Sequence, residues 1–378
     1  MAKILKLNKI SKVADKEFPS SYTLTEECDQ PDGIILRSFK MHDYPLADSL
    51  LCVARAGAGV NNIPLDKCAD KGVVVFNTPG ANANAVKELA VCMLFMCGRR
   101  IAPSLTWSQS LKGTADIGKQ VEDGKKAFIG GEVMGKTLGI AGLGAIGSKL
   151  AQAAFALGMN VIGYDPHITE ERRKSIHPDL KVVSLEELFK QSDFISLHVP
   201  YLDSTKNMVN ANSIATMKDG VNIINCARGE LVDNAAIVEA VKSGKVNRYV
   251  TDFPCEEVLG VDGIIATPHL GASTPEAEDN CAYMAAKQMV DFIENGNIVN
   301  SVNYPALSKE RTAARRLCVC TKDVDSIKAL LEKQGVNVAD MAEAHRGAYG
   351  YAVVDLNCNC TADKFNGVAG ILKARFIG

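Results

Sequence analysis

The stretch Lys136-Thr-Leu-Gly-Ile-Ala-Gly-Leu-Gly-Ala-Ile-Gly147 decides the fold expected for this chain. It opens with a short apolar run, residues 137–141, and the glycines follow at once. Residues 148–157 then have the apolar faces of a helix, and residues 159–164 form a second apolar run that ends on Asp165. Strand, glycine turn, helix, strand and acid follow in the order that a dinucleotide-binding βαβ unit requires.

Each residue type in this unit has a physical task. Gly142 permits a tight turn, Gly144 lets the backbone approach a pyrophosphate, and Gly147 lets the helix pack close to the strand. The N-terminus of the helix offers free N–H groups and a partial positive charge to phosphates. Asp165 lies 18 residues beyond Gly147, where its carboxylate can accept both ribose hydroxyls of NAD and would repel the extra phosphate of NADP. The sequence therefore predicts NAD as cofactor, and the alternative is a glycine-rich turn without a ligand.

The composition of the 378-residue chain is that of an ordinary globular protein, with 47% hydrophobic and 23% charged residues. The length allows two or three domains. A net charge of −2 gives no basic field for nucleic acid or an anionic membrane. The longest apolar run, residues 89–97, is too short to span a bilayer, and lysines interrupt the apolar N-terminus. The 12 cysteines are spread through a chain that lacks a secretion signal, so we expect reduced thiols and a cytoplasmic protein.

Short apolar strands alternate with helices over residues 1–98. Ligands of α/β sheets bind at the carboxyl ends of strands, so polar or glycine residues at those ends are candidate ligand residues. The alternative for each is a plain turn or a solvated side chain. Three strands end in such candidates: Arg37 and Ser38, Gly57 and Gly59, and Thr78.

The helix predicted over residues 86–99 is apolar almost all round, which is typical of burial at a domain junction or a subunit interface. We expect it to cross into a second domain, after which residues 100–135 are polar and irregular. Alternating strands and helices over residues 136–273 predict a parallel, doubly wound sheet. A long helix over residues 274–296 would return to the first domain.

A break near Asn303-Tyr-Pro-Ala-Leu307 indicates a linker to a small C-terminal unit with the order βαββαβ. The expected fold class is α/β. It combines a Rossmann-type doubly wound parallel sheet, a discontinuous flavodoxin-like domain and a C-terminal ferredoxin-like α+β domain. The expected domains are residues 1–98 with 275–303, residues 99–274, and residues 304–378.

Three residues of the predicted doubly wound sheet could carry chemistry. Arg228 follows an apolar strand, and its planar guanidinium suits a carboxylate. His269 stands between Pro268 and Leu270 at another strand end, and histidine exchanges protons near neutral pH. Glu257 could orient the ring and raise its pKa. An isolated histidine in such a position is more often structural, so its company decides the interpretation.

Arg228, Glu257 and His269 lie in three runs that follow one another along the chain: Asn225-Cys-Ala-Arg-Gly-Glu-Leu-Val-Asp233, Asp252-Phe-Pro-Cys-Glu-Glu257 and Thr267-Pro-His-Leu-Gly-Ala272. Together with the glycine turn and the split first domain, they resemble the D-2-hydroxyacid dehydrogenase family over residues 1–303. Within the family, the chain is most similar to the members that oxidise 3-phospho-D-glycerate. The runs Asn77-Thr-Pro-Gly80 and Ser301-Val-Asn-Tyr-Pro305 and an ACT-like C-terminal unit carry that similarity.

The resemblance implies a role for each matching residue. Arg228 would hold the substrate carboxylate, and His269 paired with Glu257 would take the hydroxyl proton while hydride leaves C2 for NAD. The Cys226 carbonyl and the Asp252 side chain would hold the nicotinamide carboxamide. Arg37 and Ser38 would bind the phosphate end of the substrate, and Gly57 and Gly59 would offer N–H groups to its carboxylate. Further positions that would touch NAD are Thr78, Ala145, Ile146, Val199, Ala227 and Gly271.

Two departures from the family pattern bear on this assignment. The family usually carries Asp-Val-Phe-x-x-Glu, whereas this chain has Asp252-Phe-Pro-Cys-Glu256-Glu257. Spacing selects Glu257, and Glu256 stays open as the partner of His269. Serine-sensitive relatives carry a His, Asn and Pro-Gly loop after the first strand of the ACT unit. Here that loop is Cys320-Thr-Lys-Asp-Val-Asp325, although Asn337 is in place, so inhibition by serine stays open.

The pairs Cys318-Val-Cys320 and Cys358-Asn-Cys360 place thiols on one face of two strands that would be antiparallel neighbours. A Cys₄ zinc site is conceivable. Structural zinc sites more often use two-residue spacers on turns, and cysteine is a common core residue, so we expect no metal.

The implied reaction is the NAD-dependent oxidation of 3-phosphoglycerate to 3-phosphohydroxypyruvate, the first step of the phosphorylated route of serine biosynthesis. One alternative is the same chemistry on glyoxylate or hydroxypyruvate. Another is an NAD-sensing corepressor, because the family fold also serves that role. The expected partners are a small-molecule substrate, a second copy in a homodimer or homotetramer, and a small-molecule effector at the ACT-like unit.

Overall fold

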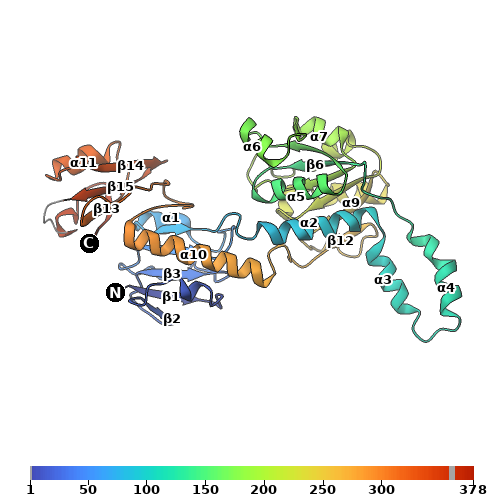
Figure 1. Ribbon diagram of the computed structural model, residues 1–378, viewed down its shortest axis with the longest axis horizontal. Coiled ribbons are helices and arrows are strands. Elements are labelled where there is room, and N and C mark those ends of the chain that lie inside the picture. The colour runs from blue at the N-terminus through green and yellow to red at the C-terminus, as the bar shows by residue number, and fades with distance from the viewer. Residues whose placement is uncertain (1, 357–361) are drawn as a thin grey trace. The chain divides into compact units, whose positions relative to one another are not determined.

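The computed structural model describes residues 2–356 and 362–378 (Figure 1). The chain forms two compact units, and the first is discontinuous. It comprises Met1–Asn82 and Pro275–Gly378, and the second comprises Ala83–Thr274.

The second unit is built on a seven-stranded parallel sheet with the order β12-β11-β10-β9-β6-β7-β8. Its first strand in the chain, β6, lies inside the sheet, and later strands are added on both sides of it. This is the Rossmann-type, doubly wound order, and it confirms the predicted sheet. The strands are β6 (Thr137–Ala141), β7 (Asn160–Tyr164), β8 (Lys181–Val182), β9 (Phe194–Leu197), β10 (Val221–Asn225), β11 (Val246–Thr251) and β12 (Ile264–Ala266).

Helices cover this sheet, and its central strands β9 and β10 are buried along their whole length, as in parallel sheets that are covered on both faces. From β6 to β11, helices alternate with strands along the chain. The helices of the unit are α2 (Ala83–Gly98), α3 (Ile101–Ser110), α4 (Ile117–Gly124), α5 (Ala145–Ala156), α6 (Glu170–Ile176), α7 (Leu185–Gln191), α8 (Ala211–Thr216) and α9 (Asn234–Lys242), with short 3₁₀ turns at Lys125–Phe128 and Gly229–Leu231.

Helix α2 is apolar because it lies in the core of the second unit. Val86, Ala90, Met93 and Leu94 are buried there, and the helix packs against α5, β10 and β11. The boundary between the units falls before α2, whereas the sequence analysis drew it after residue 98. Among the described residues, no single helix has the length and hydropathy of a membrane span; α2 and α3 meet that test only jointly, across a 71° bend.

Residues 100–135 contain two helices, so the expectation of irregular structure was wrong. Helices α3 and α4 form a hairpin in which neither helix has a buried residue (Figure 1). The Trp107 and Phe128 rings lie 5.1 Å apart between centroids and join the two arms, and Gly124 packs on Trp107. Many residues of both helices are polar, so the spacing of their apolar residues did not indicate helices in the sequence.

The first unit contains a five-stranded parallel sheet with the order β2-β1-β3-β4-β5, the order of flavodoxin-like sheets. Helix α10 (Pro275–Asn295) packs on it so closely that a Cβ atom at Gly33 would lie 2.9 Å from the Met289 sulfur. The other elements are β1 (Lys3–Leu7), β2 (Thr23–Thr25), β3 (Gly33–Leu36), β4 (Cys52–Arg55), β5 (Val74–Phe76), α1 (Leu65–Asp70) and a 3₁₀ turn at Ala14–Lys16.

The C-terminal segment forms a four-stranded antiparallel sheet with the order β14-β15-β13-β16. Numbered along the chain, these are the second, third, first and fourth strands of the segment. That is the strand order of a ferredoxin-like βαββαβ sheet. A 3₁₀ turn at Ala362–Phe365 stands where a second helix was predicted. The elements are β13 (Arg315–Lys322), α11 (Ile327–Lys333), β14 (Met341–Arg346), β15 (Tyr349–Leu356) and β16 (Ile371–Ile377).

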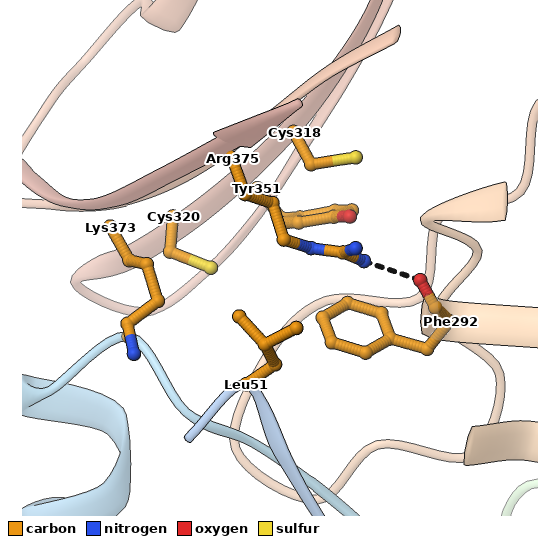
Figure 2. Close-up of a pocket in the computed structure, with 8 residues that line it drawn as sticks. Leu51, Phe292, Cys318, Cys320, Tyr351, Lys373 and Arg375 are labelled. Atoms are coloured by element: carbon orange, nitrogen blue, oxygen red, sulfur yellow. Dashed lines mark hydrogen bonds between the residues drawn. The ribbon is translucent and has the colours of Figure 1, made fainter. Parts of the chain in front are cut away.

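This small sheet shares a core with α10, and for that reason it belongs to the first unit. Figure 2 shows the Arg375 guanidinium next to Phe292, whose carbonyl accepts a hydrogen bond from it. The guanidinium lies 4.6 Å from the centre of the Phe292 ring and also donates to the Ile293 carbonyl over 2.9 Å. The Tyr351 hydroxyl donates to the Gly296 carbonyl over 2.7 Å. Side chains of β15 and β16 thus bind the last carbonyls of α10 and the residue that follows it.

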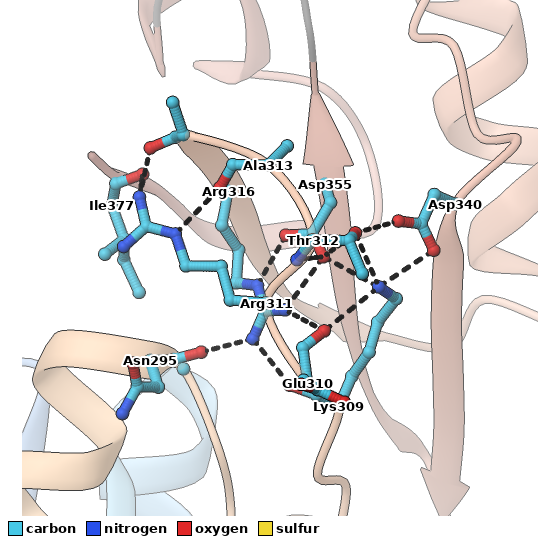
Figure 3. Close-up of polar contacts among 12 residues, drawn as sticks. Asn295, Lys309, Glu310, Arg311, Thr312, Ala313, Arg316, Asp340, Asp355 and Ile377 are labelled. Atoms are coloured by element: carbon cyan, nitrogen blue, oxygen red, sulfur yellow. Dashed lines mark hydrogen bonds and ion pairs between the residues drawn. The ribbon is translucent and has the colours of Figure 1, made fainter.

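A buried ion pair fixes the linker between α10 and β13 (Figure 3). Arg316 is fully buried, and its Nε and Nη2 atoms donate to the two Asp355 carboxylate oxygens over 2.7 and 2.9 Å. Its Nη1 atom donates to the Asn295 carbonyl at the end of α10, and Lys309 is a second cation on Asp355. Paired in this way, the two buried charges tie the sheet to the helix.

Candidate functional site

The predicted site residues of the second unit lie along the carboxyl edge of its parallel sheet. The register aligns Asn225 of β10 with Thr251 of β11, and Thr251 with Ala266 of β12. Residues that directly follow these three strands are therefore neighbours. On the other side of β10, Ala141 of β6 is aligned with Leu197 of β9. The loops with candidate residues thus run along one edge, where ligands of doubly wound sheets bind.

The glycine turn after β6 requires glycine at two positions. Gly142 has a φ of +97°, and a Cβ atom there would lie 2.6 Å from the His198 carbonyl oxygen. A Cβ atom at Gly147 would lie 1.9 Å from the Gly142 oxygen, so only glycine lets α5 approach the strand. A Cβ atom at Gly144 would meet nothing within 4 Å. The space beside Gly144 is open, as the approach of a pyrophosphate requires.

The beginning of α5 and the end of β7 complete a fit for NAD. Gly144 is the N-cap of α5 and has no side chain to cap it, so the N–H groups of Ala145 and Ile146 have no intrahelical partner. The Asp165 carboxylate accepts the Leu143 and His167 N–H groups, each over 3.0 Å. These bonds hold it beside the glycine turn, and each oxygen keeps a lone pair for a ribose hydroxyl.

Val199, the second residue after β9, is buried next to the glycine turn. The residue before it, His198, donates its backbone N–H to the Ala141 carbonyl over 2.7 Å. Its ring Nε2 atom lies 2.8 Å from the Ser196 hydroxyl, and its Nδ1 atom is buried without a hydrogen-bond partner. Burial lowers the pKa of His198 to about 4, so the ring is neutral at pH 7. The sequence analysis did not single out this histidine.

After β10, the side chains change from buried to exposed within three residues. Cys226 is buried with its thiol 3.2 Å from the Met93 sulfur, and Ala227 is half-buried. Arg228 is exposed, and its Nη1 atom donates only to the Ala227 carbonyl, over 2.6 Å. Within residues 2–356 and 362–378, no carboxylate lies within 4 Å of its guanidinium. The cation is available to an anionic ligand.

Asp252 organises the loop that carries His269. Its carboxylate is buried and accepts three hydrogen bonds, from the Thr267 hydroxyl and from the N–H groups of Leu270 and Gly271, over 2.5 to 2.7 Å. Gly271 is buried, and a Cβ atom there would lie 3.1 Å from this carboxylate. The structure thus gives Asp252 a positioning contact that the sequence analysis did not predict.

His269 has a φ of +57°, a left-handed conformation that side chains other than glycine rarely adopt. Its neighbours on both sides are fixed, because Thr267 and Leu270 bind the Asp252 carboxylate. The ring is exposed and lies 5.1 Å from the Phe253 ring between centroids. Phe253 also packs on Gly229, so it connects the Arg228 and His269 loops. Backbone strain of this kind clusters at functional sites.

Glu257 and Glu256 are both exposed, and the structure pairs neither with His269. A hydrogen bond from the Cys255 thiol lowers the pKa of Glu257, with a smaller contribution from its own backbone N–H. Asn234 at the start of α9 in turn donates to the Cys255 sulfur over 3.2 Å. Across the described residues, no ion pair within 4 Å joins either glutamate to His269. The expected contact between Glu257 and His269 is absent from this conformation.

The candidates of the first unit gather at the carboxyl edge of its own sheet. Thr78 is buried after β5 and donates its N–H to the Gly57 carbonyl over 3.1 Å. Gly59 follows in the same loop, and Ser38 is exposed after β3. Arg37 forms an ion pair with Glu278 of α10, 2.5 Å between Nη1 and Oε1. Glu278 and Arg55 were not predicted from the sequence, although Arg55 ends β4 and candidate residues were expected at strand ends.

No group of three or more His, Cys, Asp or Glu side chains in the described part of the chain could hold a metal ion. Cys318 and Cys320 are buried on β13. Cys358 and Cys360, the other half of the conceivable zinc site, lie outside the described residues.

Known proteins are similar to this chain in both sequence and architecture. Residues 92–271 match the D-isomer specific 2-hydroxyacid dehydrogenase, NAD binding domain family. A hydroxypyruvate reductase of Thermotoga maritima is 44% identical over 241 residues, which are 61% of this chain and 73% of that protein. A D-3-phosphoglycerate dehydrogenase of Homo sapiens is 37% identical over 308 residues, which are 78% of this chain.

The chain spans about half the length of the D-3-phosphoglycerate dehydrogenases that it matches, 55% of the Homo sapiens protein. Among solved structures, the NAD⁺-bound 3-phosphoglycerate dehydrogenase of Entamoeba histolytica superposes with a TM-score of 0.63 and 28% identity. That comparison covers 80% of this chain and 98% of the other.

Proposed function

This chain belongs to the D-isomer specific 2-hydroxyacid dehydrogenase family, whose cofactor is NAD, and from that membership we propose that it oxidises 3-phospho-D-glycerate to 3-phosphohydroxypyruvate. The reaction would open the phosphorylated route of serine biosynthesis. The observation that carries the proposal is the carboxyl edge of β10, β11 and β12. There an exposed arginine and an exposed histidine with a strained backbone follow strands in register, and a buried aspartate fixes the loop that carries the histidine.

In the proposed mechanism, Arg228 binds the substrate carboxylate through two parallel N–H···O bonds and withdraws charge from the adjacent C2 oxygen. His269 accepts the C2 hydroxyl proton on a ring nitrogen. Glu257 stabilises the imidazolium that results, for which its segment must move from the Cys255 thiol toward the ring. Contacts of this kind are often loose before substrate binds.

The chemistry that NAD supplies when bound is acceptance of the hydride from C2. Gly142, Gly144 and the first N–H groups of α5 would hold its pyrophosphate, and Asp165 its ribose hydroxyls. Asp252 would keep the His269 loop in place while the substrate binds.

Hydroxypyruvate or glyoxylate reduction is the second candidate function. Similarity to the Thermotoga maritima hydroxypyruvate reductase, of which the chain covers 73%, favours it. The same residues would carry it, with His269 donating the proton and the hydride moving to C2. The two candidates differ only in what occupies the distal end of the substrate.

A substrate panel tests the proposal. We expect the full-length protein to form NADH from NAD and 3-phosphoglycerate, followed by NADH absorbance, and to turn over glyoxylate and hydroxypyruvate more slowly. The His269→Ala protein should lose about 10²- to 10⁴-fold in kcat, the contribution of a general acid–base group. NAD affinity, measured by calorimetry, should stay within about twofold because no part of the glycine turn changes.

The other outcomes separate the alternatives. If only the unphosphorylated acids are turned over, the proposed mechanism stands and the proposed substrate, 3-phosphoglycerate, is rejected. Tight NAD binding without any turnover would reject the dehydrogenase in favour of an NAD-sensing corepressor.

Assembly, regulation and location belong to the same proposal. We infer a homodimer or homotetramer; since α2 is used inside the second unit, the α3–α4 hairpin with exposed Ile101, Leu105 and Ile117 is the better candidate interface. The C-terminal sheet has a ferredoxin-like strand order, and we propose that it is an ACT-like unit that binds a small-molecule effector. A cytoplasmic location, drawn from the scattered cysteines, stays a proposal.

A further inference from the structure

Two arginines of neighbouring strands lie at the carboxyl edge of the five-stranded sheet. Arg37 directly follows β3, and Arg55 ends β4, where the register aligns it with Leu36. The Arg55 Nε atom donates to the Arg37 carbonyl over 3.0 Å. A Cβ atom at Gly57 would lie 2.6 Å from Arg55 Nη1, so the glycine loop runs beside this cation. Two adjacent cations at the end of parallel strands attract a multiply charged anion.

A carboxylate of α10 is paired with Arg37. Glu278 lies in the first turn of α10, and its Oε1 atom is 2.5 Å from Arg37 Nη1. Both side chains are partly exposed, at 36% for Arg37 and 45% for Glu278, so a ligand can reach the pair from solvent. Any anion that binds Arg37 must displace Glu278 or accept its charge as a neighbour.

We propose that Glu278 is a specificity-determining residue, one that competes with the distal anion of the substrate for Arg37. The inference rests on the proposed function and assigns a cost to one class of substrate. A phosphate dianion at this end meets the Glu278 carboxylate and loses part of the attraction of Arg37. An uncharged hydroxymethyl end meets no such repulsion. Glu278 therefore narrows the preference of the enzyme for phosphorylated over unphosphorylated 2-hydroxy and 2-keto acids.

The test compares Glu278→Gln with the matched control Glu276→Gln. Glu276 lies in the same exposed helical turn, and no described cation forms an ion pair with it. We expect Glu278→Gln to lower KM for 3-phosphoglycerate by about three- to tenfold, the range of a partly exposed charge interaction at low salt. KM for hydroxypyruvate should change by less than about twofold, and the gain should shrink in high salt. The Glu276→Gln protein should match the wild type on both substrates.

Three results would overturn the inference: a parallel change of KM for both substrates, a rise of KM for 3-phosphoglycerate, or an equal gain in Glu276→Gln. If the wild type reduces hydroxypyruvate but leaves 3-phosphoglycerate unchanged, the proposed substrate fails and Glu278 is tested separately. Inorganic phosphate then serves as the probe, as an inhibitor of hydroxypyruvate reduction. Stronger inhibition of Glu278→Gln than of Glu276→Gln supports the competition, and equal inhibition rejects it.

Discussion

Individual residues at the carboxyl edge of the second unit differ in how firmly they are held. Asp252 is buried with three donors on its carboxylate, and it fixes the residues around His269. The side chains of Arg228 and His269 are exposed and have few contacts of their own. A rigid backbone with free side chains suits residues that bind and exchange a proton with a substrate.

His198 makes the stability of the second unit depend on pH. Burial lowers its pKa to about 4, while in an unfolded chain histidine titrates near 6.5. As the pH falls below about 6.5, the unfolded state takes up a proton that the folded state refuses, so stability is lost down to about pH 4. Between pH 7.5 and pH 4.5 the expected loss is about 2–3 kcal/mol.

The measurement is urea unfolding from pH 7.5 to 4.5, followed by the fluorescence of Trp107, the single tryptophan of the chain and part of the second unit. His198→Gln should lose this part of the pH slope, because glutamine does not titrate. Identical slopes in the two proteins would refute the assignment.

At the scale of elements, the β6–α5 unit combines two kinds of glycine. Gly147 is required by packing, because any Cβ atom there collides with the Gly142 carbonyl. Gly144 is not required by packing, since its surroundings are open. The fold alone therefore explains Gly147, whereas only a ligand that approaches the backbone explains Gly144.

Alanine at these two positions should have different effects. Gly147→Ala should destabilise the second unit by about 1–3 kcal/mol, as overpacking does, and weaken NAD binding as well. Gly144→Ala should leave stability within about 0.5 kcal/mol and still reduce NAD affinity about tenfold, because the methyl group takes space needed by the pyrophosphate. Thermal unfolding measures the stability of both variants, and calorimetry measures their affinity for NAD. Unchanged NAD affinity in Gly144→Ala would contradict the assigned use of the glycine turn.

Helix α10 is held at both ends by charged side chains. Near its N-terminus Glu278 pairs with Arg37, and at its C-terminus Arg316 and Arg375 donate to the last carbonyls. An acid in the first turn and cations at the end match the helix macrodipole. The helix thus joins the candidate phosphate-end site to the C-terminal sheet within one unit.

At the scale of the whole chain, the Arg316–Asp355 pair anchors the C-terminal sheet to the rest of the first unit. The pKa of the Asp355 carboxyl is held well below its usual range because Arg316, Lys309 and Thr312 bind it, in spite of its burial. Such a carboxylate contributes stability above the unfolded pKa of about 4, and this contribution is lost as the pH falls further.

Arg316→Met should cost about 3–5 kcal/mol at pH 7, because it leaves Asp355 partly unpaired in the core. The double variant Arg316→Met/Asp355→Leu should recover part of this loss, since it removes both buried charges. A double-mutant cycle measured by chemical unfolding, with circular dichroism as the signal, gives the coupling energy. A double variant less stable than the sum of the single ones would contradict the pairing.

The sequence by itself determined the features that depend on neighbours along the chain. The glycine spacing and Asp165 predicted the Rossmann-type sheet and NAD, because a βαβ unit brings residues 142–165 together by local geometry. Strand ends also predicted Arg228 and His269, since parallel strands present their carboxyl ends at one edge, whereas Asp252 was implied by the family resemblance. The helical hairpin at residues 101–124 was missed because polar residues interrupt its apolar ones.

Only the tertiary structure decided which distant side chains meet. Arg37 and Glu278 pair because α10 returns to the first sheet, and no spacing rule connects two residues so far apart in the chain. The Asp252 contacts with the His269 loop depend on the register of β11 and β12. Glu257 had the expected spacing, yet it is turned to Cys255, because the course of an exposed segment is set by contacts in space. The local sequence pattern determines which strands form and where their carboxyl ends lie. Packing between elements that are distant in the chain determines which charged side chains face each other.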